Sequence, residues 1–496
     1  MLFATSQYAV FFAVVFCIYW VTPRSWRWVF LLLASYYFYA SAIPQYLLLI
    51  LALTIFNYTL GLGIARASGR WRGALLVCAI AGNLGCIAYF KYTGLILSTL
   101  GPALSRAPLL RPALSDPLLT NILLPIGISF FVFEFIHYTV EVFRGRNPIR
   151  NPLKLALFAA FFPTQIAGPI KRFPDFLKQL DHPVRLREVD VDGAAWLVLR
   201  GLLKKVVVAD TLAPVVTLTF GHPTSLGPAA AWFGIAAFAT QLYCDFSGYT
   251  DIGRGCAQLL GFSVPENFLG PYQSAHPAEF WRRWHVSLSS WLRDYLYIPL
   301  GGSRVSSGRI YFNLLVTMAL GGLWHGASWH FLVWGVYHGI LLCVHRLWAA
   351  TIGTFGWYRR LMALWPGALA ARLVTLLLVC VGWVFFRASG LAPAGRMLMS
   401  AVAFWRPLTA GLTLDPLSSP VLLVVGAALV VVAGWIWSLA PDAAHAGWQR
   451  SQQWITSGWG RHPWFLGVRP ALFALAVVVL LAWPPQATQR FIYFQF

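Results

Sequence analysis

Charged residues are scarce in this 496-residue chain. They make up 11% of it, less than half of the roughly 25% found in soluble domains. Acidic side chains are the scarcest, with 16 Asp and Glu against 37 Lys and Arg, whereas apolar residues reach 58%. This balance excludes a water-soluble enzyme and a disordered chain. We therefore expect residues 1–496 to form a single integral membrane domain.

Cysteine is also sparse, with seven residues in the whole chain. All lie in apolar stretches and lack metal-ligand spacing, so we interpret them as small buried hydrophobic residues. A secreted disulfide scaffold is thereby excluded. The histidines offer no pair spaced by four residues on one helix face, and we expect no metal site. The net charge of +21 has a plain cause in cytoplasmic loops that face anionic lipid, so no nucleic-acid partner is expected.

Long apolar runs recur from end to end, and each is long enough to cross about 30 Å of hydrocarbon. They predict an all-α polytopic membrane protein with about 11–13 transmembrane or re-entrant helices. Arg24 and Arg27 follow the first run, which places that loop in the cytoplasm and the N-terminus outside. The runs cover residues 5–22, 28–43, 45–65, 73–97, 119–143, 192–218, 229–262, 310–325, 328–348, 372–387, 420–439 and 470–485.

Two segments depart from this pattern. Residues 155–168 are apolar but short, with basic residues on both sides, which predicts a re-entrant element that enters from the cytoplasm and turns at Pro163. A kinked span is the alternative. Residues 280–297 place aromatic side chains on one arc of a helix and arginines on the other. This separation predicts an interfacial helix, with His285 at the boundary between the arcs and Arg282 and Arg283 toward headgroups or donor phosphates.

Ionisable residues within the apolar runs are costly, so each requires a reason. Glu134, His137 and Glu141 share one helix face, where they serve either interhelical hydrogen bonds or chemistry. Asp245 and Asp251 lie among Gly248, Gly253 and Gly255, which predicts a broken helix lining a cavity, although Asp251 could instead pair with Arg254.

The densest group is GGLWHGASWHFLVWGVYHG at residues 321–339. It places His325 at the end of one predicted helix and Ser328 as the N-cap of the next. A membrane histidine is often a packing residue, but the surrounding aromatic and glycine residues favour a narrow tunnel. The residues expected along it are Trp324, His330, Tyr337 and His338.

Five blocks match the membrane-bound O-acyltransferase family in order, and more closely its bacterial alginate O-acetyltransferase branch. The blocks are PIGISFFVFEFIHY (125–138), FFPTQIAGPIKR (161–172), YCDFSGYTDIGRG (243–255), NFLGPYQSAHPAEFWRRWHVSLSSWLRDYLYIPLGGSR (267–304) and GGLWHGASWHFLVWGVYHG (321–339). The closing FIYFQF (491–496) is also typical of that branch. The core motifs thus lie within residues 120–345, and 346–496 resembles the family only in hydropathy and the final motif.

The resemblance implies a ring of helices around a central funnel in the membrane. It also implies a catalytic histidine, here His325, and a second functional histidine, here His285. Acyl transfer to a hydroxyl needs a base that titrates near neutral pH, which suits an imidazole. The resemblance further implies acetyl-CoA as the donor substrate, no bound cofactor and a location in the bacterial inner membrane. Expected partners are periplasmic or membrane-anchored acetyl-transfer proteins and an exopolysaccharide such as alginate.

Other functions remain open at this point. Asp245, Glu134 and His137 would support the reaction path in an acetyltransferase, but the same residues could relay protons in a transporter. The absence of visible repeats disfavours transport. A second alternative within the same class is D-alanyl or other acyl transfer to a cell-wall polymer. The C-terminal FIYFQF is expected to be buried, either as a partner-docking element or as an aromatic anchor in the membrane interface.

Overall fold

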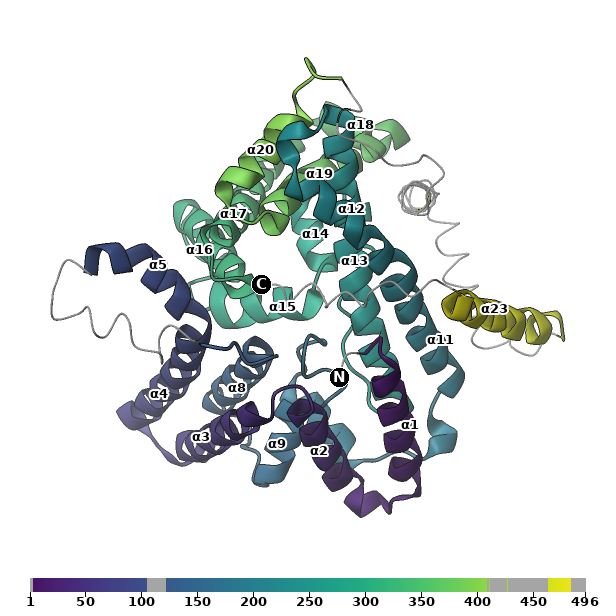
Figure 1. The fold of residues 1–496 in the computed structure, drawn as a ribbon. Coiled ribbons are helices and arrows are strands. Elements are labelled where there is room, and N and C mark those ends of the chain that lie inside the picture. The colour runs from purple at the N-terminus through teal and green to yellow at the C-terminus, as the bar shows by residue number, and fades with distance from the viewer. Residues whose placement is uncertain (1–2, 105–121, 408–409, 411–425, 427–462, 483–496) are drawn as a thin grey trace.

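The computed structural model describes residues 3–104, 122–407, 410, 426 and 463–482, and almost all of this part is helical (Figure 1). The first half of the chain forms α1 (Ser6–Val21), α2 (Arg24–Ala40), α3 (Leu47–Arg66), α4 (Gly69–Ile87), α5 (Thr93–Leu104), α8 (Ile128–Phe143), α9 (Pro152–Ala160) and α10 (Phe173–Asp181). The second half forms α11 (Val191–Leu202), α12 (Asp210–Gly221), α13 (Pro228–Leu259), α14 (Pro277–Arg283), α15 (Val286–Leu292), α16 (Ser307–His325), α17 (Trp329–Ala350), α18 (Gly356–Ala363), α19 (Trp365–Arg387), α20 (Leu391–Ala401) and α23 (Pro463–Ala482).

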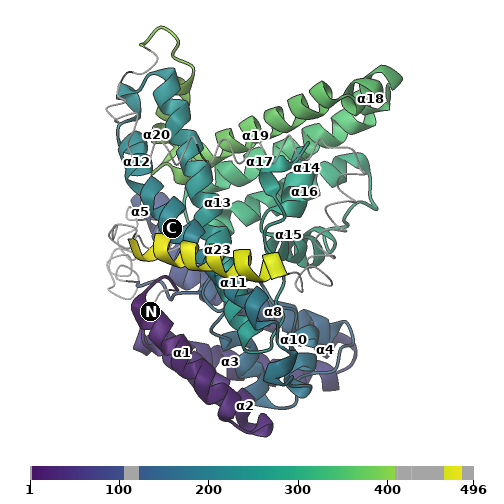
Figure 2. The ribbon, with the colours of Figure 1, turned by 90° about the vertical axis from the view of Figure 1, so that its right-hand side faces the viewer.

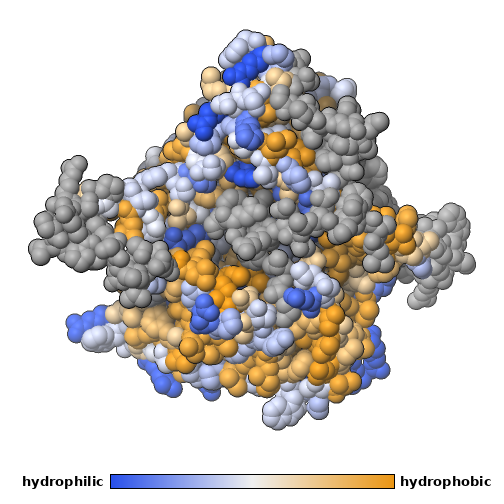
Figure 3. All heavy atoms as spheres, in the orientation of Figure 1, coloured by the Kyte–Doolittle hydropathy of each residue, from blue (hydrophilic) through white to orange (hydrophobic). Residues whose placement is uncertain are grey.

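The predicted all-helical membrane architecture is confirmed. Within the described residues, four helical stretches are long and apolar enough to cross a membrane: 44–66, 69–101, 329–354 and 365–387. Hydrophobic side chains cover a broad area over α1–α4 (Figure 3), and exposed residues there include Val10, Leu33 and Ile55. Exposed apolar surface of this extent is the normal state of a face in contact with lipid.

The helices surround a middle region that contains α15 (Figure 1). Helices α1–α4 lie on one side of it and α16–α20 on the opposite side, an arrangement that both views show (Figures 1 and 2). Helix α23 packs on the outside of α11, where Trp196 and Phe473 have ring centroids 5.4 Å apart. The funnel that the resemblance implies stays a prediction.

The predicted break in the helix over 229–262 is wrong, because α13 runs without interruption for 32 residues. Its glycines allow close packing instead. A Cβ atom on Gly248 would lie 2.8 Å from the carbonyl oxygen of Gly201, and a Cβ on Gly253 would collide with the carbonyl oxygen of Pro163. The glycines therefore bring α13 against α11 and the segment after α9, rather than bending the helix.

The predicted continuous interfacial helix over 280–297 is also wrong. Helix α14 ends at Arg283, and α15 begins at Val286. Between them, Trp284 forms an antiparallel bridge with Phe268, and His285 adopts a left-handed backbone. Pairing with a distant segment of the chain breaks the helix here, which no periodicity within 280–297 could reveal.

The segment 155–168 is buried throughout. Helix α9 covers nine residues, about 14 Å of rise, and the chain then continues as turns through Pro163. This geometry suits a re-entrant element, because non-helical backbone at membrane depth must be buried in protein. Which side of the membrane each flank faces stays a prediction.

Cysteine labelling can test this sidedness. Arg150 and His182 are both exposed and lie on either side of the segment, so a re-entrant path places both on the cytoplasmic face. We expect a membrane-impermeant maleimide to label cysteines at both positions from the same side in a background without native cysteines. Labelling from opposite sides would show that the segment crosses the membrane.

The remaining differences concern boundaries and surfaces. The run predicted from residue 119 begins its helix at Ile128. Among the cysteines, none of which forms a disulfide, Cys256 and Cys380 are buried as expected, but Cys17 and Cys78 are exposed on outer helix faces. Apart from residue 426, the run at 420–439 lies outside the described residues, as does the C-terminal 491–496.

Candidate active site

His325 is the last residue of α16 and is 5% exposed, as the sequence predicts. Aromatic rings surround its imidazole. The centroid distances are 4.8 Å to Trp324, 5.0 Å to Trp334 and 5.2 Å to Phe386. Ser328 is the N-cap residue of α17, although its side chain makes no capping hydrogen bond. The turn between two packed helices thus carries the imidazole into an apolar surround.

Two residues that the sequence analysis missed hold the end of α16. Lys91 Nζ donates to the carbonyl oxygens of Trp324 and His325, the latter at 3.0 Å. Tyr92 Oη donates to the carbonyl oxygen of Leu323 at 2.7 Å. The last carbonyls of a helix lack internal partners, and a cation there also complements the helix dipole. Lys91 and Tyr92 therefore cap the helix that presents His325.

A signal for Lys91 was present in the sequence. It is a lysine inside the apolar run 73–97, where a charge is costly. In the structure it lies in η2 (Ala88–Tyr92), a π-helical turn between α4 and α5. Such turns occur frequently at functional sites.

His285 lies in the break between α14 and α15. It is fully buried, and its φ of 43° is the only positive value among the described residues other than glycine. Hydrogen bonds on both sides maintain this conformation, because Leu269 N donates to Arg283 O and Val286 N donates to Asn267 O, each at 3.0 Å. A left-handed conformation costs a residue with a Cβ about 1–2 kcal/mol, and such strain concentrates at functional sites.

The His285 ring packs against Phe246 and Trp324, but it makes no hydrogen bond in the described part of the chain. Both ring nitrogens are buried without a hydrogen bond to any described residue. Burial lowers the pKa of His285 to about 3, because the surroundings do not solvate a charged imidazole. The ring is therefore neutral at physiological pH, with one nitrogen able to donate and the other able to accept.

Trp324 joins the two predicted catalytic histidines. Its ring centroid lies 6.1 Å from His285 and 4.8 Å from His325. On its other side it packs against Phe130 and Phe133 of α8, at 5.5 and 5.3 Å. Residues from the α14–α15 break, α16 and α17 thus form a single cluster beside α8, which we call the histidine cluster: His285, Trp324, His325, Trp334 and His338.

His338 belongs to this cluster through Trp334, whose ring centroid is 5.0 Å away. Its Nε2 is buried without a hydrogen bond in the described part of the chain. A Cβ on Gly382 would lie 2.7 Å from that nitrogen, so only glycine at this position of α19 leaves room for the ring. His338 thus lies close to the two predicted catalytic histidines, and its role along a tunnel stays a prediction.

Two other predicted tunnel residues have structural partners. His330 Nδ1 donates to the carbonyl oxygen of Phe385 at 2.9 Å, and Tyr337 Oη donates to that of Leu378 at 2.9 Å. Both bonds join α17 to α19. His330 Nδ1 and the Tyr337 hydroxyl are therefore used in contacts between these two helices.

Glu134 and His137 also take part in interhelical contacts. Glu134 forms a buried ion pair with Lys171 at 2.7 Å. His137 Nε2 accepts from the backbone N–H of Phe173 at 3.0 Å, so the proton is on Nδ1, which donates to Tyr295 Oη at 2.5 Å. These contacts attach α8 to Lys171, to the start of α10 and to Tyr295 of η8 (Arg293–Tyr297). Both residues thus make the interhelical contacts that one of the two alternatives predicts.

The two aspartates of α13 have cationic partners. Asp245 pairs with Lys205 at 2.7 Å, and Lys205 also pairs with Asp210 at 2.8 Å. Asp251 binds Lys204 at 2.8 Å and Arg200 through two hydrogen bonds. The contact of Asp251 with Arg254 is longer, at 3.9 Å. These ion pairs join α13 to α11 and η5 (Leu203–Ala209).

The predicted donor-binding arginines lie on α14. Arg282 is exposed, whereas Arg283 pairs with Glu279 at 2.7 Å and donates to the carbonyl oxygen of Leu269 at 3.3 Å. Of the two, Arg282 is therefore the one with a guanidinium available to a phosphate. The described residues contain no group of three potential metal ligands.

The chain has clear relatives. A family model for the membrane-bound O-acyltransferase family, MBOAT, matches residues 142–380. The probable alginate O-acetylase AlgI of Pseudomonas aeruginosa is 41% identical over 411 residues, which cover 82% of this chain and 75% of that protein. The protein of the same name from Azotobacter vinelandii is 39% identical over 444 residues, covering 87% and 84%. The peptidoglycan O-acetyltransferase of Helicobacter pylori is 33% identical over 411 residues, covering 77% and 74%.

This chain therefore belongs to the membrane-bound O-acyltransferase family and is a multi-pass membrane enzyme that transfers acyl groups to oxygen. Within that family it is similar to the alginate O-acetylases named above. The family assignment favours acyl transfer over the proton-coupled transport that the intramembrane acidic residues left open.

The strained backbone allows a test of His285. Glycine adopts a positive φ without the Cβ penalty of about 1–2 kcal/mol, which offsets part of the cost of the cavity that the buried ring leaves. We therefore expect His285→Gly to lose less thermal stability and membrane level than His285→Ala. If the imidazole takes part in the reaction, acyl transfer should fall at least about 100-fold. Retained activity in this variant would show that His285 only fills the core.

Proposed function

We propose that this enzyme takes an acetyl group from acetyl-CoA on the cytoplasmic side and passes it across the bacterial inner membrane toward O-acetylation of an exopolysaccharide such as alginate. The observation that carries the proposal is the histidine cluster, in which two buried imidazoles from different segments approach one tryptophan. The names of the relatives support the acetyl group and the polymer acceptor.

In this proposal His325 acts as the general base. Its neutral imidazole accepts the proton of an acceptor hydroxyl while the oxygen attacks the carbonyl carbon of the thioester. The carbon–sulfur bond then breaks, and the imidazolium returns the proton to the departing thiolate. The products are the acetyl ester and free thiol, so atoms and charge balance. General base catalysis of this kind contributes about 10²–10⁴-fold.

We assign His285 the role of a hydrogen-bond donor to the substrate, because its ring makes no hydrogen bond to a described residue. A neutral ring with a free N–H can donate to the oxygen that gains negative charge as the thioester is attacked, and such a donor is worth more in a site without water. Arg282, on the exposed side of α14, is assigned to the phosphates of the donor. Asp245 contributes indirectly, since the next residue, Phe246, packs 4.8 Å from His285.

The acceptor side requires further proteins. We propose that periplasmic or membrane-anchored acetyl-transfer partners receive the group and deliver it to the polymer, while membrane lipids surround the helices. No bound cofactor is required, because the thioester already activates the acetyl group.

Membrane vesicles can test the donor, the direction and the acceptor together. Inside-out vesicles containing the enzyme and its partners would receive acetyl-CoA with a labelled acetyl group on the cytoplasmic face. We expect label in polymer inside the vesicle that is released by mild base. A parallel reaction would supply labelled D-alanyl carrier protein instead. Transfer from D-alanyl carrier protein alone would contradict the proposed donor. Label in peptidoglycan would contradict the proposed acceptor.

A further inference from the structure

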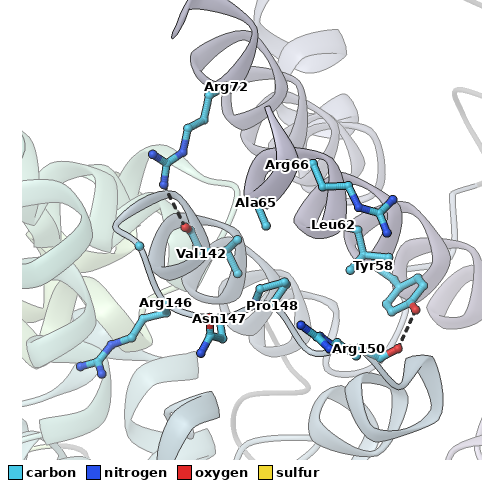
Figure 4. Close-up of a pocket in the computed structure, with 11 residues that line it drawn as sticks. Tyr58, Leu62, Ala65, Arg66, Arg72, Val142, Arg146, Asn147, Pro148 and Arg150 are labelled. Carbon is cyan, nitrogen blue, oxygen red and sulfur yellow. Dashed lines mark hydrogen bonds between the residues drawn. The ribbon is translucent and has the colours of Figure 1, made fainter. Parts of the chain in front are cut away.

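A basic pocket of about 540 Å³ lies where the α3–α4 hairpin meets the segment after α8 (Figure 4). Its residues are far in sequence from those of the histidine cluster. Four of its eleven lining residues are arginines: Arg66 and Arg72 from the hairpin, and Arg146 and Arg150 from the segment. None of the lining residues is acidic. The pocket is thus lined by arginines from two separate parts of the chain, although the Arg146 side chain points away from the other three (Figure 4).

The walls of the pocket are held in place by hydrogen bonds. Arg72 donates to the carbonyl oxygen of Phe143 at 2.7 Å, and its guanidinium lies 5.2 Å from the centre of the Phe143 ring. Tyr58 Oη donates to the carbonyl oxygen of Arg150 at 2.7 Å (Figure 4). These contacts join the hairpin to the end of α8 and the segment that follows, so the shape does not depend on a bound ligand.

Three of the four lining arginines have no carboxylate partner in the described residues. The fourth, Arg146, lies 3.9 Å from Glu141, whose carboxylate also pairs with Arg144 at 2.9 Å. In the described part of the chain, no carboxylate lies within ion-pair distance of Arg66, Arg72 or Arg150. Guanidinium groups that line one pocket without counter-charges repel one another, and a bound anion would lower this repulsion.

The pocket also lies at a membrane boundary. The long apolar stretch 44–66 ends at Arg66, and the next one begins at Gly69. Trp71, next to the pocket, is 65% exposed, which is typical of an aromatic anchor at the headgroup level. The lining includes an apolar side as well, formed by Leu62, Ala65, Val142 and Pro148. An occupant with a phosphate and an apolar portion fits both sides.

We propose that this pocket binds the phosphate of an anionic phospholipid headgroup. Guanidinium groups bind phosphate oxygens through paired N–H···O bonds, and a volume of this size is within the range of small-molecule sites. The phosphate bridges Arg66 and Arg150 and thereby joins the hairpin to the segment after α8. Bound lipid stabilises this side of the enzyme at a distance from the reaction.

The test uses the full-length protein in nanodiscs of phosphatidylcholine with or without phosphatidylglycerol. We expect phosphatidylglycerol to raise the melting temperature of the wild type and to remain bound in native mass spectrometry. Arg66→Gln combined with Arg150→Gln should weaken this binding about 25-fold, since each arginine near a membrane surface contributes about one fivefold step. These two side chains make no hydrogen bond in the described structure, so the variant removes charge without removing wall contacts.

The matched control is Arg304→Gln with Arg360→Gln, which removes the same charge from exposed positions elsewhere. It should bind phosphatidylglycerol like the wild type. Equal loss in both variants would mean a diffuse surface effect and would overturn the proposal. Inorganic phosphate or coenzyme A in phosphatidylcholine nanodiscs forms a further arm. If either reproduces the stabilisation and competes at the pocket, a soluble phosphate rather than a lipid is the occupant, and the proposal fails.

Discussion

Replacing His325 with alanine is expected to lower O-acetylation at least about 100-fold while the amount of protein in the membrane stays unchanged. The substitution removes the only group assigned to accept the proton, and general bases contribute about 10²–10⁴-fold. Incorporation of labelled acetyl groups from the thioester into polymer measures the activity. Immunodetection in the membrane fraction measures the amount of the variant. The His325 backbone still ends α16 in this variant, because Lys91 binds its carbonyl oxygen rather than its ring.

The matched control for this experiment is His222→Ala. His222 is exposed and lies outside the histidine cluster, so its loss should change neither activity nor level. Near-normal acetylation in the His325 variant would contradict the proposed mechanism. A large drop in its membrane level would instead indicate a packing role for the ring.

Replacing Lys91 with methionine is expected to reduce turnover roughly tenfold to hundredfold. The change leaves the carbonyl oxygens of Trp324 and His325 without their donor, and an unsatisfied buried acceptor costs about 1–3 kcal/mol. Methionine retains a similar length, so the main effect is a looser end of α16. We therefore expect kcat to fall while the KM for the thioester changes little, because Lys91 positions His325 and does not contact the donor in this assignment.

Two further variants separate positioning from general stability. Lys91→Arg keeps donors at this site and should retain more activity than the methionine variant. Lys178→Met removes a lysine outside the cluster, and its kcat should match that of the wild type. If Lys91→Met reduced the membrane level in proportion to activity, with kcat per molecule unchanged, the positioning role would be wrong.

Part of the site could be predicted from local sequence. The helix end at His325 and the N-cap at Ser328 could be predicted because both depend on residues that are neighbours in the chain. The ionisable residues in apolar runs were also visible, because a charge in such a run needs a partner whatever the fold. Their partners were not visible. Glu134 pairs with Lys171, 37 positions later, and no periodicity relates the two.

The helix errors have the same origin. Glycines in α13 predicted a break, because glycine lowers helix propensity, but the close approach of α11 makes small residues necessary there. The arcs of 280–297 predicted one continuous helix, whereas the bridge between Phe268 and Trp284 interrupts it. In both places a contact between distant segments outweighed a local preference.

The sequence by itself determined the class of this protein. Apolar runs with few charges can satisfy their backbone in a membrane only as helices, and the ordered blocks between residues 125 and 339 carry the family resemblance. The tertiary structure decided how the chemistry-bearing residues meet: the left-handed His285, the cap that Lys91 forms on α16, and the arginines that α3, α4 and the segment after α8 bring to one pocket. Hydropathy acts on each residue separately, whereas these arrangements depend on pairs of residues far apart in the chain, which only the packed helices bring together.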